Sequence, residues 1–134
     1  MGNTTEQKVT NILELESLFK DVEAIFNSVQ SEYELSKEEV LILLTLWDKG
    51  SMTLKEMDDY VPVKSYKRTR TYNDLVEKSW VTKERPKNDE RTVIIHFNAS
   101  MKKEKEQLLD YIIKEAQERK EKMQSSLNSI LNLS

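Results

Sequence analysis

Several common building blocks are scarce or missing in this sequence of 134 residues. It has no cysteine, which excludes disulfides, thiolate metal sites and redox sensing by a thiol. It has only two glycines and two prolines, so we expect few and short loops. No apolar run reaches the ~18 residues that a membrane-spanning helix needs, and no basic start followed by an apolar stretch marks a secretory signal. We therefore expect a cytoplasmic protein without a membrane segment.

The charge is unevenly distributed along the chain. The net charge is −3, and residues 1–39 carry nine acidic against three basic side chains. Residues 63–73 carry four basic side chains and no acidic one. This cluster of positive charge predicts contact with a polyanion such as nucleic acid, although the chain as a whole is acidic.

The first two expected helices differ in character. Apolar residues at three- and four-residue steps predict an amphipathic helix over about residues 10–31. A capping box, Ser36 with Glu39, starts a second helix that runs to about Asp48, and Gly50 is suited to end it. Because this second helix is apolar nearly all round, we expect it at the centre of the fold.

Two shorter helices are expected in the middle of the chain. A second capping box, Thr53 with Glu56, opens a helix over 54–60. Pro62 prevents its continuation, because proline lacks an N–H and restricts the residue before it. A further helix is predicted over about 64–78.

The hydrophobic period then changes twice. Residues 80–85 and 91–97 are rich in β-branched and aromatic residues, and the turn-forming residues 86–90 separate them, which predicts a hairpin. Residues 51–52 are suited to a very short strand. Over 99–131 the helical period returns and predicts one helix ~45 Å long. A small domain cannot cover that length, so we expect part of its apolar face to pack on another chain.

The order of these elements indicates the architecture. Two short helices around a proline-containing turn, followed by a hairpin, form a helix-turn-helix with a wing. We predict one mainly α-helical winged helix-turn-helix domain over 1–134 with a small β-hairpin. The helix-turn-helix would span about 54–78, the wing about 80–97, and dimerisation helices about 10–31 and 99–131.

The helix over 64–78 is the predicted recognition helix. One face would carry Lys67, Arg70, Thr71, Asp74 and Lys78. The opposite face, expected to pack on the core, would carry Ser65, Thr69, Tyr72 and Val76. The predicted DNA contacts are Lys64, Tyr66, Lys67, Arg68, Arg70 and Thr71. Three alternatives stay open: the basic face is only a solvated surface, the Tyr66 ring packs on the hairpin, or Arg68 pairs with an acid instead of a phosphate.

The hairpin tip carries further predicted DNA contacts. Asp89 or Glu90 is placed to brace the Arg91 guanidinium, and a braced arginine loses less entropy when it enters a narrow minor groove. Arg85 and Lys87 are expected to contact backbone phosphates. The alternative is a solvated turn with a surface ion pair worth under ~1 kcal/mol.

No set of residues predicts catalysis or cofactor binding. His96, the single histidine, lies within an expected strand, where we expect a structural role. No spacing of carboxylates indicates a metal cage, and the chain has no glycine-rich phosphate loop. Trp47 and Trp80 are expected to pack in the core or at a hinge. We therefore expect no enzyme, no cofactor and no metal.

Four stretches carry a family resemblance. They are residues 39–47, 49–58 and 66–73, and the Asp-Glu-Arg-Thr-Val run at 89–93. In these stretches the sequence resembles the SarA branch of the MarR-type winged-helix regulators of staphylococci. The likeness covers about residues 10–131 and is strongest over 36–98.

The resemblance implies a winged-helix homodimer, joined by its N- and C-terminal helices, that binds AT-rich promoter DNA. It implies a regulator of virulence that represses toxin and exoprotein genes and activates some surface-protein genes. The family's wing arginine corresponds to Arg91, its acidic neighbours to Asp89 and Glu90, and its recognition-helix contacts to residues 64–70. Several relatives sense oxidation through a cysteine, and this chain has none, so thiol control is excluded.

Two classes of function remain in view. The leading hypothesis is a regulator that binds double-stranded promoter DNA as a homodimer. The alternative is a winged-helix module for protein–protein contact, which would sequester another regulator through its acidic N-terminal third. The uncompensated positive charge of residues 63–73 favours DNA, because a protein-binding surface would not require it.

Overall fold

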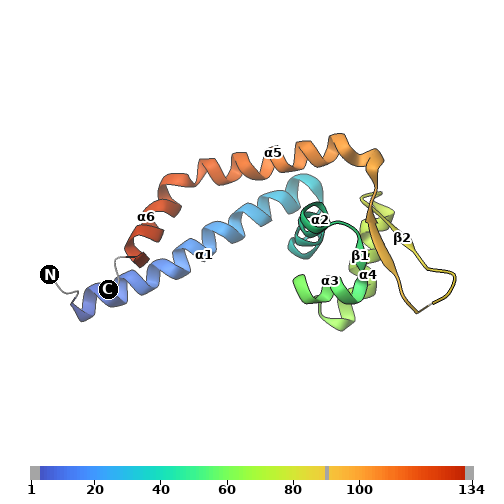
Figure 1. Ribbon diagram of the computed structural model, residues 1–134. Helices are drawn as coiled ribbons and strands as arrows, with labels where there is room; N and C mark the ends of the chain where they lie inside the picture. The colour runs from blue at the N-terminus through green and yellow to red at the C-terminus, as the bar shows by residue number, and fades with distance from the viewer. Residues whose placement is uncertain (1–3, 90, 132–134) are drawn as a thin grey trace. The chain divides into compact units, whose positions relative to one another are not determined.

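The computed structural model describes residues 4–89 and 91–131 and divides into two compact units (Figure 1). The first unit combines the N-terminal segment up to Glu34 with the C-terminal segment from Leu108. The second unit is Leu35–Gln107 and contains the helix-turn-helix and the hairpin.

The second unit is built around α2, Lys37–Lys49. The predicted capping box is confirmed: the Glu39 N–H donates to Ser36 Oγ at 3.2 Å, and the Ser36 N–H donates to Glu39 Oε1 at 2.9 Å. Gly50 ends the helix with φ 90°, a backbone conformation that residues other than glycine rarely adopt. Val40 and Leu43 are fully buried, which confirms the expected central place of α2 in the core.

Two helices follow as predicted. The Thr53 capping box opens α3, Leu54–Tyr60, with the Glu56 N–H donating to Thr53 Oγ1 at 3.1 Å. After the turn at Pro62 the chain forms α4, Ser65–Glu77. Ser79 then adopts φ 69°, and the Trp80 N–H donates to the Leu75 carbonyl at 3.0 Å. This left-handed C-terminal cap of α4 turns the chain directly into the sheet.

The sheet has three antiparallel strands in the order β1-β3-β2 (Figure 1). The hairpin strands β2, Val81–Glu84, and β3, Ile94–Phe97, are confirmed but shorter than predicted. The short strand expected at 51–52 is β1, Met52–Thr53, one residue further along. Met52 pairs with Ile95, so the base of the hairpin is attached to the start of the helix-turn-helix.

The first unit contains α1, Thr5–Tyr33, which begins earlier than predicted because the Thr4 hydroxyl accepts the Gln7 N–H at 3.1 Å.

The single helix predicted over 99–131 is wrong. A 3₁₀ turn, η1 (Ala99–Met101), leads into α5, Lys102–Glu118, which spans the boundary between the units. The chain then bends before α6, Lys120–Leu131.

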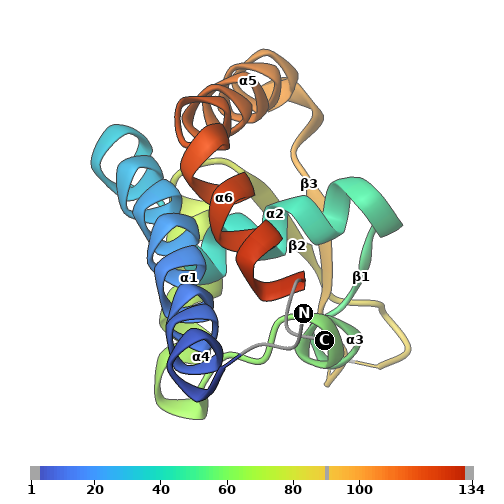
Figure 2. The same ribbon diagram turned by 90° about the vertical axis from the view of Figure 1, so that its left-hand side faces the viewer.

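The bend has a local cause that the composition does not reveal. The Arg119 N–H donates to the Ala116 carbonyl at 3.1 Å, one residue short of the α-helical partner. The Glu115 carbonyl therefore does not receive the Arg119 N–H, and it accepts a hydrogen bond from the Arg119 guanidinium at 3.0 Å instead. Beyond the bend α6 lies along α1, as Figures 1 and 2 show. The last part of the predicted long helix therefore packs on α1 of the same chain.

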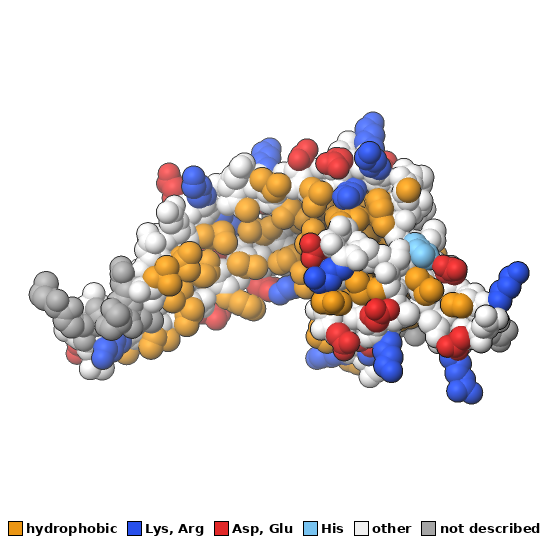
Figure 3. All heavy atoms as spheres, viewed as in Figure 1, with side chains coloured by type: hydrophobic (Ala, Val, Ile, Leu, Met, Phe, Trp, Pro, Cys, Tyr) orange, Lys and Arg blue, Asp and Glu red, His pale blue; other side chains and the backbone are white. Residues whose placement is uncertain are grey.

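Two polar contacts fix α6 on α1. Lys122 Nζ lies 3.1 Å from Asp21 Oδ1, and the Ser126 hydroxyl donates to Glu14 Oε2 at 2.7 Å. Large apolar side chains of this unit nevertheless remain exposed, and Figure 3 shows hydrophobic atoms gathered over α1, α5 and α6. On α1 they are Val9, Ile12, Leu13, Leu15 and Phe19. In the part of the chain that the structure describes, no helix is long and apolar enough to cross a membrane.

Candidate nucleic-acid interface

The N-terminal half of α4 presents exposed cations. Lys64, Tyr66, Lys67 and Arg70 are all exposed, with Tyr66 at 77% and the Arg70 side chain at 87%. The first turn of α4 contains no acidic residue, so the positive end of the helix dipole adds to these charges. The result is a local group of exposed cations on a protein whose net charge is −3, with one acid, Asp74, 4.0 Å from Arg70 Nε.

The face of α4 that packs on the core differs from the predicted one. Tyr72 and Leu75 are buried at 1% and 0% exposure, and of the predicted core face only Tyr72 is correct. Ser65, Thr69 and Val76 are exposed instead. The three-residue step between Tyr72 and Leu75 sets the orientation, because these two large side chains bury more apolar area than serine or threonine can.

Two residues placed on the groove-facing side make contacts within the protein. Lys78 is half-buried, and its Nζ lies 3.1 Å from Glu39 Oε2 on α2. The Thr71 hydroxyl donates to the Lys67 carbonyl at 2.9 Å, inside α4. The exposed cationic side of α4 is therefore narrower than predicted and centres on Lys64, Lys67 and Arg70.

Arg68 pairs with an acid, which is one of the alternatives that the sequence analysis left open. Its Nη2 lies 2.8 Å from Asp58 Oδ2 of α3 and donates to the Val63 carbonyl at 3.4 Å. The Arg68 side chain is 42% exposed, about half the exposure of Arg70. The structure thus pairs Arg68 with an acid of another helix at 2.8 Å, whereas the acid beside Arg70 is Asp74 of α4 itself, whose Oδ2 lies 4.0 Å from Arg70 Nε.

The loop of the hairpin carries the second group of cations. Arg85, Lys87 and Arg91 are exposed, and Figure 3 shows Lys and Arg side chains projecting from this end of the second unit. Glu90, one of the two predicted braces of Arg91, lies outside the described residues. The other predicted brace, Asp89, lies within the described residues.

Asp89 supports the backbone at Arg91. Its Oδ1 accepts the Arg91 N–H at 3.1 Å, and its Oδ2 accepts the Thr92 hydroxyl at 2.5 Å. The hydrogen bond from the Thr92 hydroxyl, and then that from the Arg91 N–H, hold the pKa of Asp89 below its ordinary value. Among the described residues the partners of the Asp89 carboxylate are the Arg91 N–H and the Thr92 hydroxyl, and the bracing of the Arg91 guanidinium stays a prediction.

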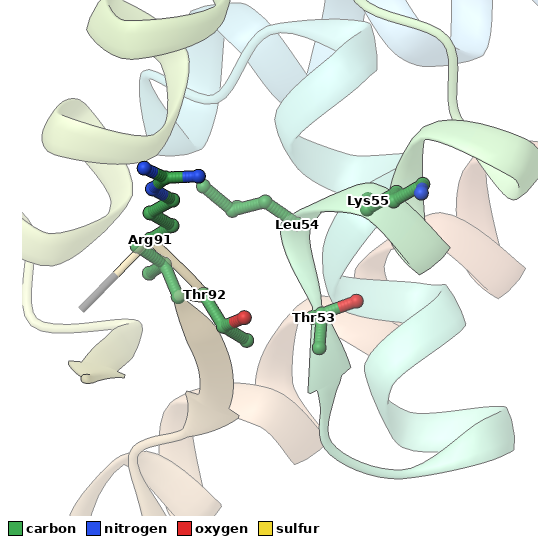
Figure 4. Close-up of a pocket in the computed structure, with 6 residues that line it drawn as sticks. Thr53, Leu54, Lys55, Arg91 and Thr92 are labelled. Atoms are coloured by element: carbon green, nitrogen blue, oxygen red, sulfur yellow. The ribbon is translucent and has the colours of Figure 1, made fainter. Parts of the chain in front are cut away.

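A hollow of about 250 Å³ separates the hairpin loop from the β1–α3 junction. Arg91 and Thr92 line one side, and Thr53, Leu54 and Lys55 line the other. Figure 4 shows the Arg91 and Leu54 side chains pointing toward each other, while Lys55 points away. The Leu54 N–H donates to the Val93 carbonyl at 3.0 Å, which fixes the two sides of the hollow at their base.

Polar contacts also join the hairpin to its surroundings. Lys83 Nζ donates to Asn73 Oδ1 at 2.7 Å and links β2 with α4. His96 Nε2 lies 2.6 Å from Glu84 Oε1, and its Nδ1 lies 2.7 Å from Ser51 Oγ. His96 therefore ties β3 to β2 and to the residue before β1, which is the structural role expected of it.

Three aromatic rings pack at the base of the wing. Trp47 lies 6.2 Å from Trp80 and 5.4 Å from Phe97 between ring centroids. Lys105 Nζ lies 5.3 Å from the centre of the Trp47 ring. The packing role predicted for both tryptophans is confirmed.

Sequence reasoning missed Asp58, Asn73 and Glu84 as partners of these side chains. One signal was available for Asp58: a cation on the core side of an amphipathic helix requires an acid opposite it, because a buried unpaired charge is costly. Asn73 and Glu84 are exposed polar residues, and nothing in the sequence pattern distinguishes them from other such residues. Only the folded chain brings them next to Lys83 and His96.

The sequence comparisons decide the family. A family model described as the transcriptional regulator SarA/Rot matches residues 24–108. The chain is 56% identical over 131 residues to the HTH-type transcriptional regulator Rot of Staphylococcus aureus strain MRSA252, covering 98% of this chain and 79% of that protein. This chain belongs to the SarA/Rot family. It is accordingly a transcriptional regulator and not an enzyme, and its predicted resemblance to the SarA branch is confirmed.

A more distant relative and several solved structures extend the family comparison. The uncharacterized HTH-type regulator YpoP of Bacillus subtilis is 32% identical over 89 residues, covering 66% of this chain and 62% of that one. The transcriptional regulator PA4135 superposes with a TM-score of 0.72 at 15% identity, covering 91% of this chain and 90% of that chain. A MarR-like regulator from Bacillus cereus gives 0.71 at 12% identity, covering 87% of each. These structures confirm the predicted winged-helix fold of the MarR type.

AbfR bound to DNA, in its reduced form, is another structural relative. It gives a TM-score of 0.62 at 22% identity and covers 95% of each chain. At that identity the likeness shows the fold of this SarA/Rot family member and nothing finer.

Proposed function

We propose that this SarA/Rot family member binds promoter DNA by laying α4 in the major groove and inserting Arg91 into an adjacent minor groove. The observation that carries the proposal is the exposed cationic side of α4, centred on Lys64, Lys67 and Arg70, in a helix whose first turn has no acid. A helix of this kind fits the major groove of B-DNA, and its N-terminal end reaches phosphates and base edges.

Tyr66 is the residue of α4 best placed to contact a base or sugar. Its ring is 77% exposed, and Lys67 Nζ lies 5.9 Å from the ring centre. An exposed ring of this size is costly in water and gains by stacking against an apolar surface such as a sugar or a thymine methyl group. The lysine beside it would neutralise a neighbouring phosphate.

Arg91 has the features of a minor-groove contact. Its side chain is exposed, while its backbone N–H is held by Asp89 at 3.1 Å. Fixing the backbone lowers the entropy lost on insertion, and the narrow minor groove of AT-rich DNA attracts arginine. Arg85 and Lys87 on the same loop would contact the flanking phosphates.

A homodimer would bring two copies of this surface to one duplex. The apolar side chains on α1 are more exposed than a soluble monomer favours, with Leu13 at 64% and Phe19 at 55%. Pairing these faces about a two-fold axis would bury them. Two recognition helices would then read half-sites about one helical turn apart.

The relatives supply the biological setting of the proposal. Rot carries the name of an HTH-type transcriptional regulator, and AbfR has been solved bound to DNA. We infer the same class of action here: a cytoplasmic regulator of virulence genes that represses toxin and exoprotein genes and activates some surface-protein genes. The alternative role, sequestration of another regulator, gains no support from the exposed cations of α4.

Salt dependence of DNA binding tests the proposal. The affinity of the full chain for an AT-rich and a GC-rich duplex of equal length is measured by fluorescence anisotropy at several salt concentrations. The logarithm of the association constant should fall steeply with the logarithm of salt concentration, by about 0.9 for each phosphate neutralised. The AT-rich duplex should bind more tightly. A flat slope, or no binding to either duplex in dilute buffer, would contradict the proposal.

A further inference from the structure

Arg68 joins the three parts of the helix-turn-helix. It belongs to α4, its Nη2 lies 2.8 Å from Asp58 Oδ2 on α3, and the same nitrogen donates to the Val63 carbonyl in the turn at 3.4 Å. One guanidinium therefore contacts the first helix, the connecting turn and the recognition helix together.

The surroundings of this ion pair are buried, although part of each side chain reaches the surface. Asp58 Oδ1, Arg68 Nε and the Tyr72 hydroxyl are all shielded from solvent and have no hydrogen-bond partner among the described residues. Burial, and then the negative charge of Asp58, raise the pKa of Tyr72, whereas Arg68 opposes that rise. The three groups thus share one poorly solvated region between α3 and α4, where a charge is costly unless it is paired.

We propose that Arg68 is a positioning residue, which fixes the orientation of α4 on α3 through Asp58, and that it does not neutralise a DNA phosphate. This inference rests on the proposed function, because it concerns how the recognition helix is held for DNA. Arg70, two positions further along α4, has an 87% exposed side chain and provides the contrast. The two arginines have the same chemistry in one helix and are assigned different tasks.

The first test compares Arg68→Gln with Arg70→Gln in the same DNA-binding titration. If Arg70 contacts a phosphate, its loss lowers the salt slope by about 1. Loss of Arg68 should weaken binding by about tenfold, because α4 would lose its ion pair with Asp58 and so its fixed orientation. The salt slope should stay unchanged, because no phosphate contact is lost. A slope that falls by about 1 for Arg68→Gln would show a phosphate contact and overturn the inference.

The second test changes Asp58, the acid of the pair. The expected change in DNA affinity is a decrease, whereas the loss of a negative charge near DNA would by itself raise the affinity. Asp59→Asn is the matched control, because Asp59 is the exposed neighbour of Asp58 on α3. Removing an acid near DNA reduces repulsion, so Asp59→Asn should leave the affinity unchanged or raise it slightly. Asp58→Asn should weaken binding like Arg68→Gln. If Asp58→Asn binds DNA as tightly as the wild type, the positioning role is wrong.

Two controls separate positioning from loss of fold. Stoichiometric titration should show the same active fraction for each variant and the wild type, and the ratio of AT-rich to GC-rich affinity should fall only for the Asp58 and Arg68 variants. If Arg68→Gln fails to fold, Arg68→Lys retains the charge, and wild-type affinity and selectivity in that variant would overturn the inference. If the wild type itself binds no DNA, the proposed function fails, which is a distinguishable result.

Discussion

Lys78 Nζ lies 3.1 Å from Glu39 Oε2, so the end of α4 is attached to the beginning of α2, the central helix. The same carboxylate closes the α2 capping box, because its Oε1 accepts the Ser36 N–H at 2.9 Å. The Glu39 side chain is only 6% exposed. One buried acid thus starts α2 and anchors the C-terminal end of α4.

Lys78→Met should destabilise the protein by about 1–3 kcal/mol, because it leaves the buried Glu39 carboxylate without its cation. Chemical denaturation measures the change in the free energy of unfolding. Asp48→Asn is the control: Asp48 is 75% exposed and lies 3.6 Å from Lys49, a surface pair that should contribute less than about 0.5 kcal/mol. Equal stability of Lys78→Met and the wild type would show that the pair contributes nothing.

Arg91→Ala should weaken binding to an AT-rich duplex by about tenfold or more and reduce the preference over a GC-rich one, because it removes the proposed minor-groove contact. The Lys67→Ala/Arg70→Ala double variant should weaken binding to both duplexes and lower the salt slope by about 2. Anisotropy titrations measure both effects. Lys8→Ala on α1 removes an exposed cation from the other unit and should leave the affinity unchanged. Wild-type affinity in the Arg91 and the double variant would exclude this surface.

The start of each core helix was predictable because it depends on local chemistry. Ser36 with Glu39 and Thr53 with Glu56 satisfy helix N–H groups within four residues, so their hydrogen bonds form as the sequence pattern predicts. Gly50 likewise marks the end of α2 by its own backbone freedom. These features need no information about tertiary packing.

The features that were missed depend on contacts distant in sequence or on unusual local geometry. The bend at Arg119 involves neither glycine nor proline, and its guanidinium supplies the hydrogen bond that the helix lacks. Ser79 adopts φ 69° at a position where glycine is the usual signal. The rotation of α4 follows from the burial of Tyr72 and Leu75, and Asp58 allows it, since an arginine can line a partly buried face only where an acid meets it. The sequence carried a signal for the orientation of α4 and for an acid opposite Arg68, but none for the bend at Arg119 or for the backbone of Ser79.

Asp89→Ala should loosen the hairpin loop and weaken DNA binding, because Arg91 would lose its fixed backbone. The lowered pKa of Asp89 gives the sign of the pH effect. The hydrogen bonds to its carboxylate are fully present above the ordinary pKa of an aspartate and are lost only as the pH falls through the lowered pKa. The Arg91 amide signal in NMR should therefore stay constant from neutral pH down to about pH 5 and shift only in stronger acid. Asn88→Ala, in the same loop, should leave that signal in place. An Arg91 amide shift centred between pH 5 and 7 would disprove the assignment to Asp89.

Tyr72→Phe should change the free energy of unfolding by less than about 0.5 kcal/mol or stabilise the protein, because the buried hydroxyl has no hydrogen-bond partner among the described residues. Leu75→Ala, one turn away and fully buried, should destabilise it by about 2–5 kcal/mol through the cavity it leaves. Thermal and chemical denaturation of both variants give the comparison. A large loss of stability in Tyr72→Phe would mean that the hydroxyl is bonded in solution.

Leu13→Glu should disrupt the proposed homodimer while leaving the monomer folded, because Leu13 is 64% exposed and contributes little to the core of its own chain. Burying one leucine side chain contributes about 1.5–3 kcal/mol, and a two-fold interface contains two copies, so the dimer dissociation constant should rise at least about a hundredfold. Light scattering at micromolar concentration should report a dimer for the wild type and a monomer for the variant. Glu16→Gln, at an exposed polar position on the same helix, should remain dimeric. DNA affinity should fall with dimerisation in Leu13→Glu, since one recognition helix then contacts a single half-site. A wild type that is monomeric at this concentration would refute the two-fold model, and a dimeric Leu13→Glu would show that the interface does not depend on Leu13.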